Sequence, residues 1–349
     1  MPNRYFTKSR AATLALALTT ALPFATPAAA EGEVNLYSSR HYDTDERLYS
    51  DFTEATGIKV NRIEDKGGKL MARMEAEGAD SPADLFITAD AGNLWKAADM
   101  GLLQSVESDV LNEAIPAELR HPEGLYYGFS QRARIIFYDK ASVDPSMIQT
   151  YEDLAKPELK GKVCTRTSGN IYMLSLMSSI IEANGADGAK DWAAAVWENR
   201  ARDPEGGDTD QLRGIASGQC AVAVSNHYYF ARALRKDVKN LANPDDTDKL
   251  GWVFPNQEGR GTHVNISGGG VAKNAPNKEN AIKFLEYLVS PEAQKYFGDG
   301  NDEFPVIAGV EPSEGVSSMG EFKADTVSVA VFGERQAEAK AVYDEVGYE

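Results

Sequence analysis

The chain has 349 residues, of which 36 are lysine or arginine and 53 are aspartate or glutamate, so its formal net charge is −17. An acidic surface of this kind argues against binding to nucleic acid or to an anionic membrane surface. The length suggests about two lobes of ordinary domain size.

Residues 1–30 have the organisation of a secretory signal peptide. A basic start precedes an apolar stretch, and Ala28-Ala29-Ala30 forms a small-residue cleavage site. The apolar stretch contains Pro23 and Pro27 and is too short to span a bilayer. We expect cleavage after Ala30, which removes three positive charges and no negative ones. Because there is no Arg-Arg pair, the general secretory route to the periplasm is favoured over the twin-arginine route.

Strand and helix patterns alternate in the first part of the mature chain. Three short strands are each followed by a segment with helical spacing of its apolar residues. The strands are predicted at 33–39, 58–64 and 83–90, and the helices at 43–57, 67–78 and 91–103. Alternation of this kind indicates a parallel sheet that helices cover on both faces.

Two long extended segments, 124–140 and 261–274, separate this run from the rest of the chain. Between them lies a second α/β run, with strands at 161–167 and 220–225 and helices at 170–185, 189–201, 210–218 and 228–237. After the second extended segment, one helix is predicted over 278–298. Two α/β runs joined by extended crossings predict two lobes that enclose a cleft, and closure about the crossings can trap a ligand.

We therefore expect an α/β fold in which each lobe is a mostly parallel sheet with flanking helices, and in which two crossing strands join the lobes. The first lobe is predicted to comprise residues 31–130 and 264–305. The second lobe is predicted to comprise residues 131–263 and 306–349.

The chain has two cysteines, Cys164 and Cys220. An even number in an oxidising compartment favours a disulfide over free thiols. A two-thiolate metal site is the other alternative, but there is no C-x-x-C pair and no nearby His-x-x-His to complete it. A bridge would tie the strand that leads to Tyr172 to the strand that leads to Tyr228 and Tyr229.

Sequence signatures of catalysis are weak. The chain contains neither G-x-S-x-G nor H-E-x-x-H. The segment 65–70, "DKGGKL", lacks the first glycine and the final Ser or Thr of a phosphate-binding loop. The acidic turn 298–302, "GDGND", lacks the length and the terminal glutamate of a calcium loop. The sequence contains no recognisable pair of nucleophile and base, so it does not indicate a secreted hydrolase. We therefore expect a binding protein and not an enzyme.

Four tyrosines stand at predicted strand-to-helix junctions: Tyr42, Tyr172, Tyr228 and Tyr229. Ligands of open α/β sheets bind outside the carboxyl ends of the strands, and a helix N-terminus favours an ionised phenolate. The alternative is ordinary packing, because the chain has 15 tyrosines. Phenols have an ordinary pKa near 10, so four of them suit a hard trivalent cation such as ferric iron, whereas softer ions call for cysteine and histidine.

Several segments resemble the periplasmic ferric-iron-binding proteins of bacterial ABC importers, and in particular their cyanobacterial FutA-type branch. The segments that carry the resemblance are 37–60, 81–97, 168–181, 226–234, 265–294 and "EFPV" at 303–306. Together they span essentially the whole mature chain. The resemblance implies a two-lobed solute-binding protein, type II-like, that closes on one Fe(III) ion.

The resemblance also implies a ligand set. The family's four phenolate ligands match Tyr42, Tyr172, Tyr228 and Tyr229. His41 stands where several members place a histidine that ligates the metal or lies beside it. The fifth and sixth ligands stay open between His41, water and a small anion such as carbonate. Binding of ferrous iron stays open as well.

Two arginines are implied to act beside the ligands. Arg132 matches an arginine that projects into the cleft near the iron, where it can hold an anion. The second arginine follows from spacing and not from the resemblance: Arg232 follows Tyr228 by four residues on the same helix face, so it can reach the phenolates or the open coordination position. Four phenolates exceed the charge of a 3+ ion by one, and Arg132, Arg232 or a protonated His41 can neutralise the excess.

The implied partners are an inner-membrane ABC permease and its ATPase; no nucleic acid is expected, and the protein is expected to be a monomer. The alternative is the same two-lobed fold holding an organic or oxyanion solute. A polyamine cleft would require carboxylates and aromatic walls, and a sulfate cleft would require helix N-termini with Ser and Gly. A sugar is a further alternative of this kind.

Overall fold

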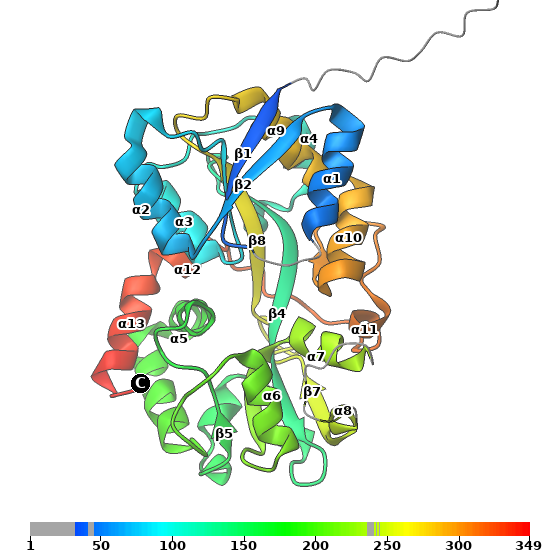
Figure 1. Cartoon of the computed structure of the whole chain (residues 1–349). Helices are drawn as coiled ribbons and strands as arrows, with labels where there is room; N and C mark the ends of the chain where they lie inside the picture. Colours follow the sequence, from blue (N-terminus) through cyan, green and yellow to red (C-terminus); the bar gives the residue numbers. More distant parts are fainter. Residues whose placement is uncertain (1–31, 41–44, 236–240, 242, 244) are drawn as a thin grey trace, which may run out of the picture.

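The computed structural model describes residues 32–40, 45–235, 241, 243 and 245–349 (Figure 1). The predicted signal peptide and its cleavage site lie outside the described residues. His41 and Tyr42, two of the predicted metal ligands, lie outside them as well. No helix in the described part of the chain is long and apolar enough to cross a membrane.

The first α/β run folds as predicted. Its strands β1 (Glu33–Ser38), β2 (Lys59–Glu64) and β3 (Leu85–Thr88) are parallel, with β1 in the middle. They alternate with the helices α1 (Asp45–Thr56), α2 (Gly67–Glu77) and α3 (Ala91–Asp99). All four residues of β3 are buried, and α1 buries Leu48, Tyr49 and Phe52 against the sheet. The helical spacing of these apolar residues is therefore the cause of the packing.

The two predicted crossings are the strands β4 (Tyr127–Asp139) and β8 (Val264–Val271), which run antiparallel through the middle of the molecule (Figure 1). The first half of β4, as far as Ala133, pairs with β8, and the second half pairs with β6 (Val222–Asn226) and β7 (Leu250–Val253). One continuous strand thus connects the two parts of the sheet.

The nine-stranded sheet has the order β2-β1-β3-β8-β4-β6-β5, with β7 and β9 (Phe304–Pro305) paired to β4. It is a mixed sheet: β8 is antiparallel to β3, and β6 is antiparallel to β4. In the second part β5 (Val163–Cys164) and β6 run parallel. The crossing strands run against their neighbours, so the sheet has fewer parallel pairs than the alternation predicts.

The second α/β run contains α5 (Ile171–Glu198), α6 (Asp208–Ala216) and α7 (His227–Leu234). Gly185 interrupts α5 with φ +73°, at the boundary between the two helices predicted there. The remaining helices are α4 (Asp109–Ala114), α8 (Asp246–Lys249), α9 (Lys278–Leu288), α10 (Pro291–Asn301), α11 (Glu314–Ser317), α12 (Val331–Glu334) and α13 (Gln336–Glu345). Short 3-10 helices lie at Gly78–Asp80, Ala117–Leu119, Pro145–Met147, Glu152–Ala155 and Pro157–Leu159.

The prediction of one helix over 278–298 is wrong, because α9 ends at Leu288 and α10 begins at Pro291. Ser290 caps α10, its hydroxyl accepting a hydrogen bond from the Ala293 amide at 3.3 Å. Proline has no amide hydrogen to continue a helix but suits a first turn, so the Ser-Pro pair starts a new helix.

Buried apolar residues form one large core around β1, β2, β3 and the adjoining half of β4, and two further clusters around β5, β6, β7 and the other half of β4. The C-terminal segment contributes to both regions. Val329 and Phe332 pack in the first core, whereas Val342 and Tyr343 pack beside α5. The lobe boundaries given above stay a prediction.

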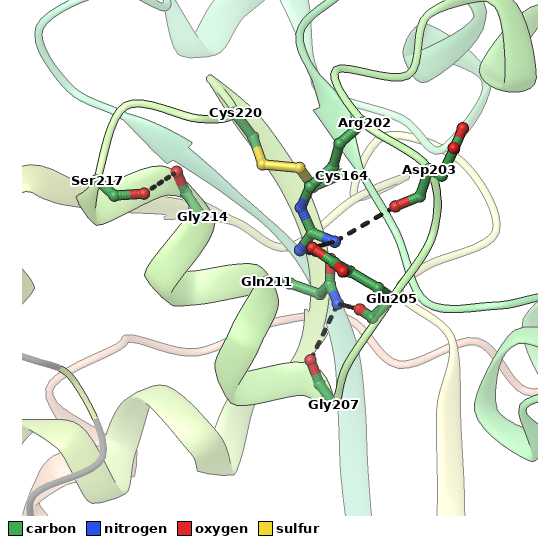
Figure 2. The surroundings of a disulfide bond; sticks show 9 residues. All are labelled: Cys164, Arg202, Asp203, Glu205, Gly207, Gln211, Gly214, Ser217 and Cys220. Carbon is green, nitrogen blue, oxygen red and sulfur yellow. Dashed lines mark hydrogen bonds and ion pairs between the residues drawn. A yellow bond between two sulfur atoms is a disulfide. The ribbon is translucent and has the colours of Figure 1, made fainter.

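Cys164 and Cys220 form the predicted disulfide, with their Cα atoms 5.8 Å apart (Figure 2). Cys164 is the last residue of β5, and Cys220 lies two residues before β6, the strand that pairs in parallel with β5. Gly214 of α6 approaches closely: a Cβ atom there would lie 2.7 Å from the Cys220 sulfur. The disulfide is thus packed between the sheet and α6, and position 214 of this helix has room only for glycine.

Candidate metal site

A cleft of about 930 Å³ lies at the carboxyl ends of β1, β2 and β3 and at the start of α5. Its walls come from the segments that follow the three strands, from the loop before α5, and from α7. They include Ser38–Arg40, Glu64–Gly67, Thr88–Asp90, Gly169–Tyr172 and Tyr229. The cleft therefore lies where open α/β sheets bind ligands and draws on both parts of the molecule.

Tyr172 is the second residue of α5 and lines this cleft. Asn170 caps the helix, and its side-chain oxygen accepts a hydrogen bond from the Tyr172 amide at 3.1 Å. Three guanidinium groups face the Tyr172 ring, with Cζ-to-centroid distances of 5.4 Å for Arg132, 5.4 Å for Arg166 and 5.9 Å for Arg134. Cations at such distances are attracted to an aromatic ring and surround this tyrosine with positive charge.

Tyr228 and Tyr229 lie in the first turn of α7, directly after β6. Their ring centroids are 4.3 Å apart, and the ring planes are inclined by 32°. Tyr228 is buried, whereas Tyr229 is half-buried and lines the cleft with Tyr172. The Cζ atom of Arg232 lies 4.7 Å from the Tyr228 centroid and 5.9 Å from the Tyr229 centroid. The i,i+4 spacing thus brings this arginine onto the tyrosine pair.

Arg40 also belongs to the cleft, although it was not among the predicted site residues. It lines the cleft and directly precedes His41 and Tyr42, which lie outside the described residues. Its Nε atom is 2.9 Å from Asp45 Oδ2, and its Nη1 atom is 3.2 Å from Glu303 Oε2. Its place inside the "YSSRHYD" motif was the available signal.

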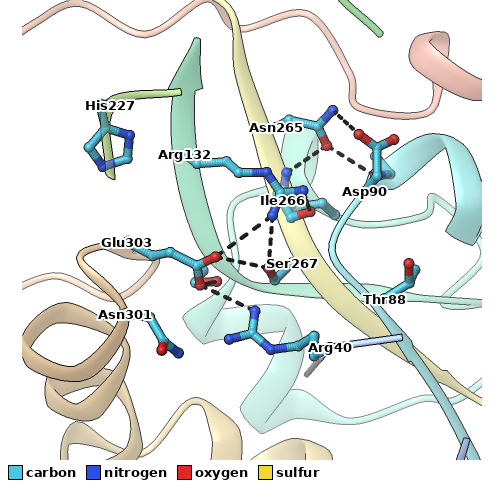
Figure 3. Close-up of polar contacts among 12 residues, drawn as sticks. Arg40, Thr88, Asp90, Arg132, His227, Asn265, Ile266, Ser267, Asn301 and Glu303 are labelled. Carbon is cyan, nitrogen blue, oxygen red and sulfur yellow. Dashed lines mark hydrogen bonds and ion pairs between the residues drawn. The ribbon is translucent and has the colours of Figure 1, made fainter. Parts of the chain in front are cut away.

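Arg132 and Glu303 lie at the centre of a buried polar network beneath the cleft (Figure 3). Arg132 donates to Ser267 Oγ at 3.0 Å and to the Ile266 carbonyl at 2.7 Å, and its Nη1 atom is 3.7 Å from Glu303 Oε1. Burial opposes the charge on Arg132, but the anionic forms of nearby groups, including Glu303, raise its pKa above the usual value. Both terminal nitrogens of Arg132 already contact protein groups.

Glu303 is fully buried between Arg40 and Arg132. Burial raises the pKa of the Glu303 carboxyl. The two arginines and a hydrogen bond from the Ser130 hydroxyl at 2.6 Å lower it by more, so the pKa lies below its usual value. Glu303 is the first residue of the "EFPV" segment, which gives that segment a structural role in placing two arginines.

Asp90 lines the cleft and connects three elements; Figure 3 shows its contact with Asn265. Its carboxylate accepts hydrogen bonds from the Gly92 amide of α3 at 2.8 Å, the Ser175 hydroxyl of α5 at 3.1 Å and the Asn265 amide of β8 at 3.0 Å. Burial raises the pKa of Asp90 to about 6, although Arg132 and these hydrogen bonds oppose the rise. Like the tyrosines, Asp90 stands at a strand-to-helix junction, so its position was a signal that the sequence offered.

The raised pKa of Asp90 predicts a pH dependence of stability. An acid that holds its proton more tightly in the folded state makes stability fall as pH rises, here from the unfolded value of 3.8 to the folded value of about 6. The variant Asp90→Asn lacks this titration. The difference in unfolding free energy between the wild type and this variant should therefore shift by about 2.4 kcal/mol in favour of the variant between pH 4 and pH 7.5.

Urea unfolding of both proteins at the two pH values measures this shift. The variant Glu303→Gln serves as the comparison of opposite sign. The pKa of Glu303 is lowered, so its contribution to stability is present at neutral pH and is lost as pH falls. If the difference in unfolding free energy between the wild type and Asp90→Asn stays constant with pH, the pKa of Asp90 is not raised in the folded state.

His227 contributes to packing beside the site and does not line the cleft. Its ring stacks on Phe304 at 4.3 Å, and its Nδ1 atom accepts a hydrogen bond from the Ala133 amide at 3.1 Å. Burial lowers its pKa to about 3, so the ring is neutral. Within the described ranges, no three His, Cys, Asp or Glu side chains gather in a group that could hold a metal ion.

A cleft that draws on two α/β units connected by crossing strands defines a solute-binding protein. The chain matches the family model of bacterial extracellular solute-binding proteins over residues 47–324. It belongs to this family.

Its relatives include several proteins named for iron. Over 326 residues the chain is 45% identical to iron uptake protein A1 of Synechocystis sp., a match that covers 93% of this chain and 90% of the relative. The major ferric iron-binding protein of Neisseria meningitidis serogroup B is 26% identical over 336 residues, covering 95% of this chain and 96% of the relative. The predicted resemblance to ferric-iron-binding proteins is confirmed.

Solved structures agree with the fold. A Trichodesmium protein, IdiA or FutA, solved in complex with iron and citrate ligands, is 54% identical with a TM-score of 0.87, covering 91% of this chain and 100% of that one. The ferric binding protein from Campylobacter jejuni is 45% identical with a TM-score of 0.84, covering 90% of this chain and 100% of that one. The predicted two-lobed α/β fold is therefore confirmed.

Proposed function

We propose that this protein binds one ferric ion outside the cytoplasm and delivers it to the permease of an ABC transporter. The main support is that Tyr229 at the start of α7 and Tyr172 at the start of α5 line one cleft, while the buried Tyr228 packs against Tyr229. Guanidinium groups lie close to the rings of all three tyrosines. Tyr42, from the segment after β1, is the fourth proposed ligand. Relatives of high identity named for iron uptake support the choice of metal.

Charge balance supports phenolate ligation. A phenolate is stabilised by nearby positive charge, and Arg132, Arg134 and Arg166 all face Tyr172. Arg232 does the same for the tyrosine pair. These cations compensate for the negative charge by which four phenolates exceed a 3+ ion. The remaining coordination positions are proposed for His41, water or a small anion; the Trichodesmium relative was solved in complex with iron and citrate ligands.

Membership of the solute-binding family supports the proposed transport role. Extracellular solute-binding proteins pass their cargo to ABC transporters, so the proposed partners are an inner-membrane permease and its ATPase. We propose that the chain is exported through cleavage after Ala30, acts in the periplasm as a monomer, and has no enzymatic activity.

An absorption spectrum tests this function. Adding ferric citrate to iron-free protein should produce a visible phenolate-to-iron charge-transfer band that saturates at one equivalent. Gallium(III), which has the same charge but no such band, should compete for the site and abolish the colour. If iron produces no band while a polyamine, sulfate or a sugar raises the melting temperature, the alternative solute-binding role is correct.

Iron binding should weaken as pH falls. Each tyrosine must lose its proton to ligate, so affinity should fall by about tenfold per pH unit for every proton released on binding. The measurement is iron retained after dialysis against citrate at a series of pH values, with circular dichroism to confirm that the chain stays folded. Retention that does not change with pH would argue against phenolate ligands.

A further inference from the structure

Asp208 is a fully buried carboxylate that does not touch the tyrosines but holds two of the arginines that do. It is the first residue of α6. Its Oδ1 atom accepts a hydrogen bond from Arg134 Nη1 at 2.9 Å, and its Oδ2 atom accepts one from Arg166 Nη1 at 2.9 Å. Both guanidinium groups lie within 6 Å of the Tyr172 ring centroid. One carboxylate thus holds two cations beside Tyr172.

The same network reaches the start of α7. Arg134 Nη1 also donates to Asn226 Oδ1 at 3.0 Å. Asn226 occupies the N-cap position of α7, where an asparagine oxygen usually accepts from the helix backbone, yet it makes no such cap here. Its side chain is used by Arg134 instead. Asp208 therefore lies between the beginnings of α5 and α7, the two helices that carry Tyr172, Tyr228 and Tyr229.

Positive charge surrounds the side chain of Asp208. The N-terminus of α6 carries partial positive charge, and two arginines lie against the two oxygens. Asp208 and Asp210 both lie in the first turn of α6, but only Asp208 is buried. Asp210 accepts instead from the Gly207 amide at 2.7 Å and serves as a local cap. Asp210 thus caps the start of α6, whereas the carboxylate of Asp208 is used by the two arginines.

We propose that Asp208 is a positioning residue of the iron site: by holding Arg134 and Arg166, it fixes Tyr172 in the orientation that ligates the metal. This inference rests on the proposed function. It assigns a role to a carboxylate that never contacts the ion, and it predicts that the loss of this group acts through Tyr172. A purely through-space role would act oppositely, because removing a negative charge near phenolates would favour their ionisation.

The test is Asp208→Asn, which keeps the size of the side chain and removes its charge. We expect the iron affinity to fall by about 10–100-fold, as is typical when a group that orients a metal ligand is lost. We also expect the charge-transfer absorbance per bound iron to decrease, because Tyr172 leaves the coordination shell. A loss of stability alone would not change the absorbance of protein that is fully loaded with iron.

A double-mutant cycle with Tyr172→Phe isolates the proposed path. In the Tyr172→Phe background, Asp208→Asn should cost less than about threefold in affinity, because the residue it positions is already absent. Asp246→Asn is the matched control. It removes another buried carboxylate of the same part of the molecule, paired with Lys249 at 2.9 Å, and it should leave the spectrum and affinity unchanged.

Should Asp208→Asn fail to fold, Arg166→Gln replaces it in the cycle, since Arg166 is partly exposed and lines the cleft. Its effect should have the same direction and should also vanish in the Tyr172→Phe background. A wild type that develops a ferric band while the Asp208→Asn variant keeps full affinity and absorbance overturns this inference and leaves the proposed function intact. A wild type with no ferric band overturns both.

Discussion

Replacing Tyr229 with phenylalanine should lower the affinity for ferric iron by more than about a hundredfold and remove most of the visible colour. Loss of a group that merely orients a metal ligand typically costs 10–100-fold, and loss of the ligand itself should exceed that range. Phenylalanine keeps the ring that packs on Tyr228 at 4.3 Å and removes only the hydroxyl of a residue that lines the cleft. Affinity is measured by competition with citrate, and colour by absorbance per bound iron.

Tyr126→Phe is the matched control for this substitution. Tyr126 is buried in the first core, away from the cleft, and its hydroxyl has no hydrogen-bond partner within the described part of the chain. Burial raises the pKa of this phenol, so it stays protonated at neutral pH. Removing the hydroxyl should leave binding, colour and stability unchanged. Equal loss of iron in both variants would show that the effect of Tyr229→Phe is not local.

Tyr42→Phe provides a second comparison, because we assign Tyr42 to the other lobe. A ligand favours the closed state only through its greater affinity for that state. The variant should form a weaker but coloured complex that compacts less than the wild type when iron is added, as measured by small-angle scattering. The proposed division of roles fails if Tyr42→Phe closes fully and Tyr229→Phe keeps its colour.

Removing the disulfide should lower the free energy of unfolding by about 4 kcal/mol. The bridge closes a loop with a sequence separation of 56 residues, and in the chain-entropy model a loop of this length restricts the unfolded chain by that amount. The double variant Cys164→Ala/Cys220→Ala removes it without leaving a thiol. Denaturant unfolding of the variant and the wild type measures the difference.

Two controls accompany the disulfide variant. Wild-type protein treated with a reductant should unfold at nearly the same denaturant concentration as the variant, and the variant itself should not respond to the reductant. Thiol titration of the denatured, unreduced wild type should detect no free cysteine. Two free thiols, or a double variant as stable as the wild type, would refute the prediction.

The local patterns of the sequence predicted most of the secondary structure. Alternating strands and helices, two extended crossings and the interruption at Gly185 all reflect short-range preferences, and the structure contains each of them. The break between α9 and α10 was missed because apolar residues continue at helical spacing across it, while the Ser290-Pro291 pair carried the opposing signal. The antiparallel strand pairs were missed because strand direction depends on which distant segments pair.

The sequence by itself indicated the tyrosines at the strand-to-helix junctions as proposed ligands, the pair of cysteines and the two-lobed α/β class. Only the tertiary structure decided which charged groups surround the tyrosines. Arg134 comes from a crossing strand, Arg166 from the loop before α5 and Asp208 from α6, and they meet only because these segments converge at one end of the sheet. Local spacing contains no information about such contacts, because a buried charge is stable only beside a partner that the folded chain brings to it from elsewhere.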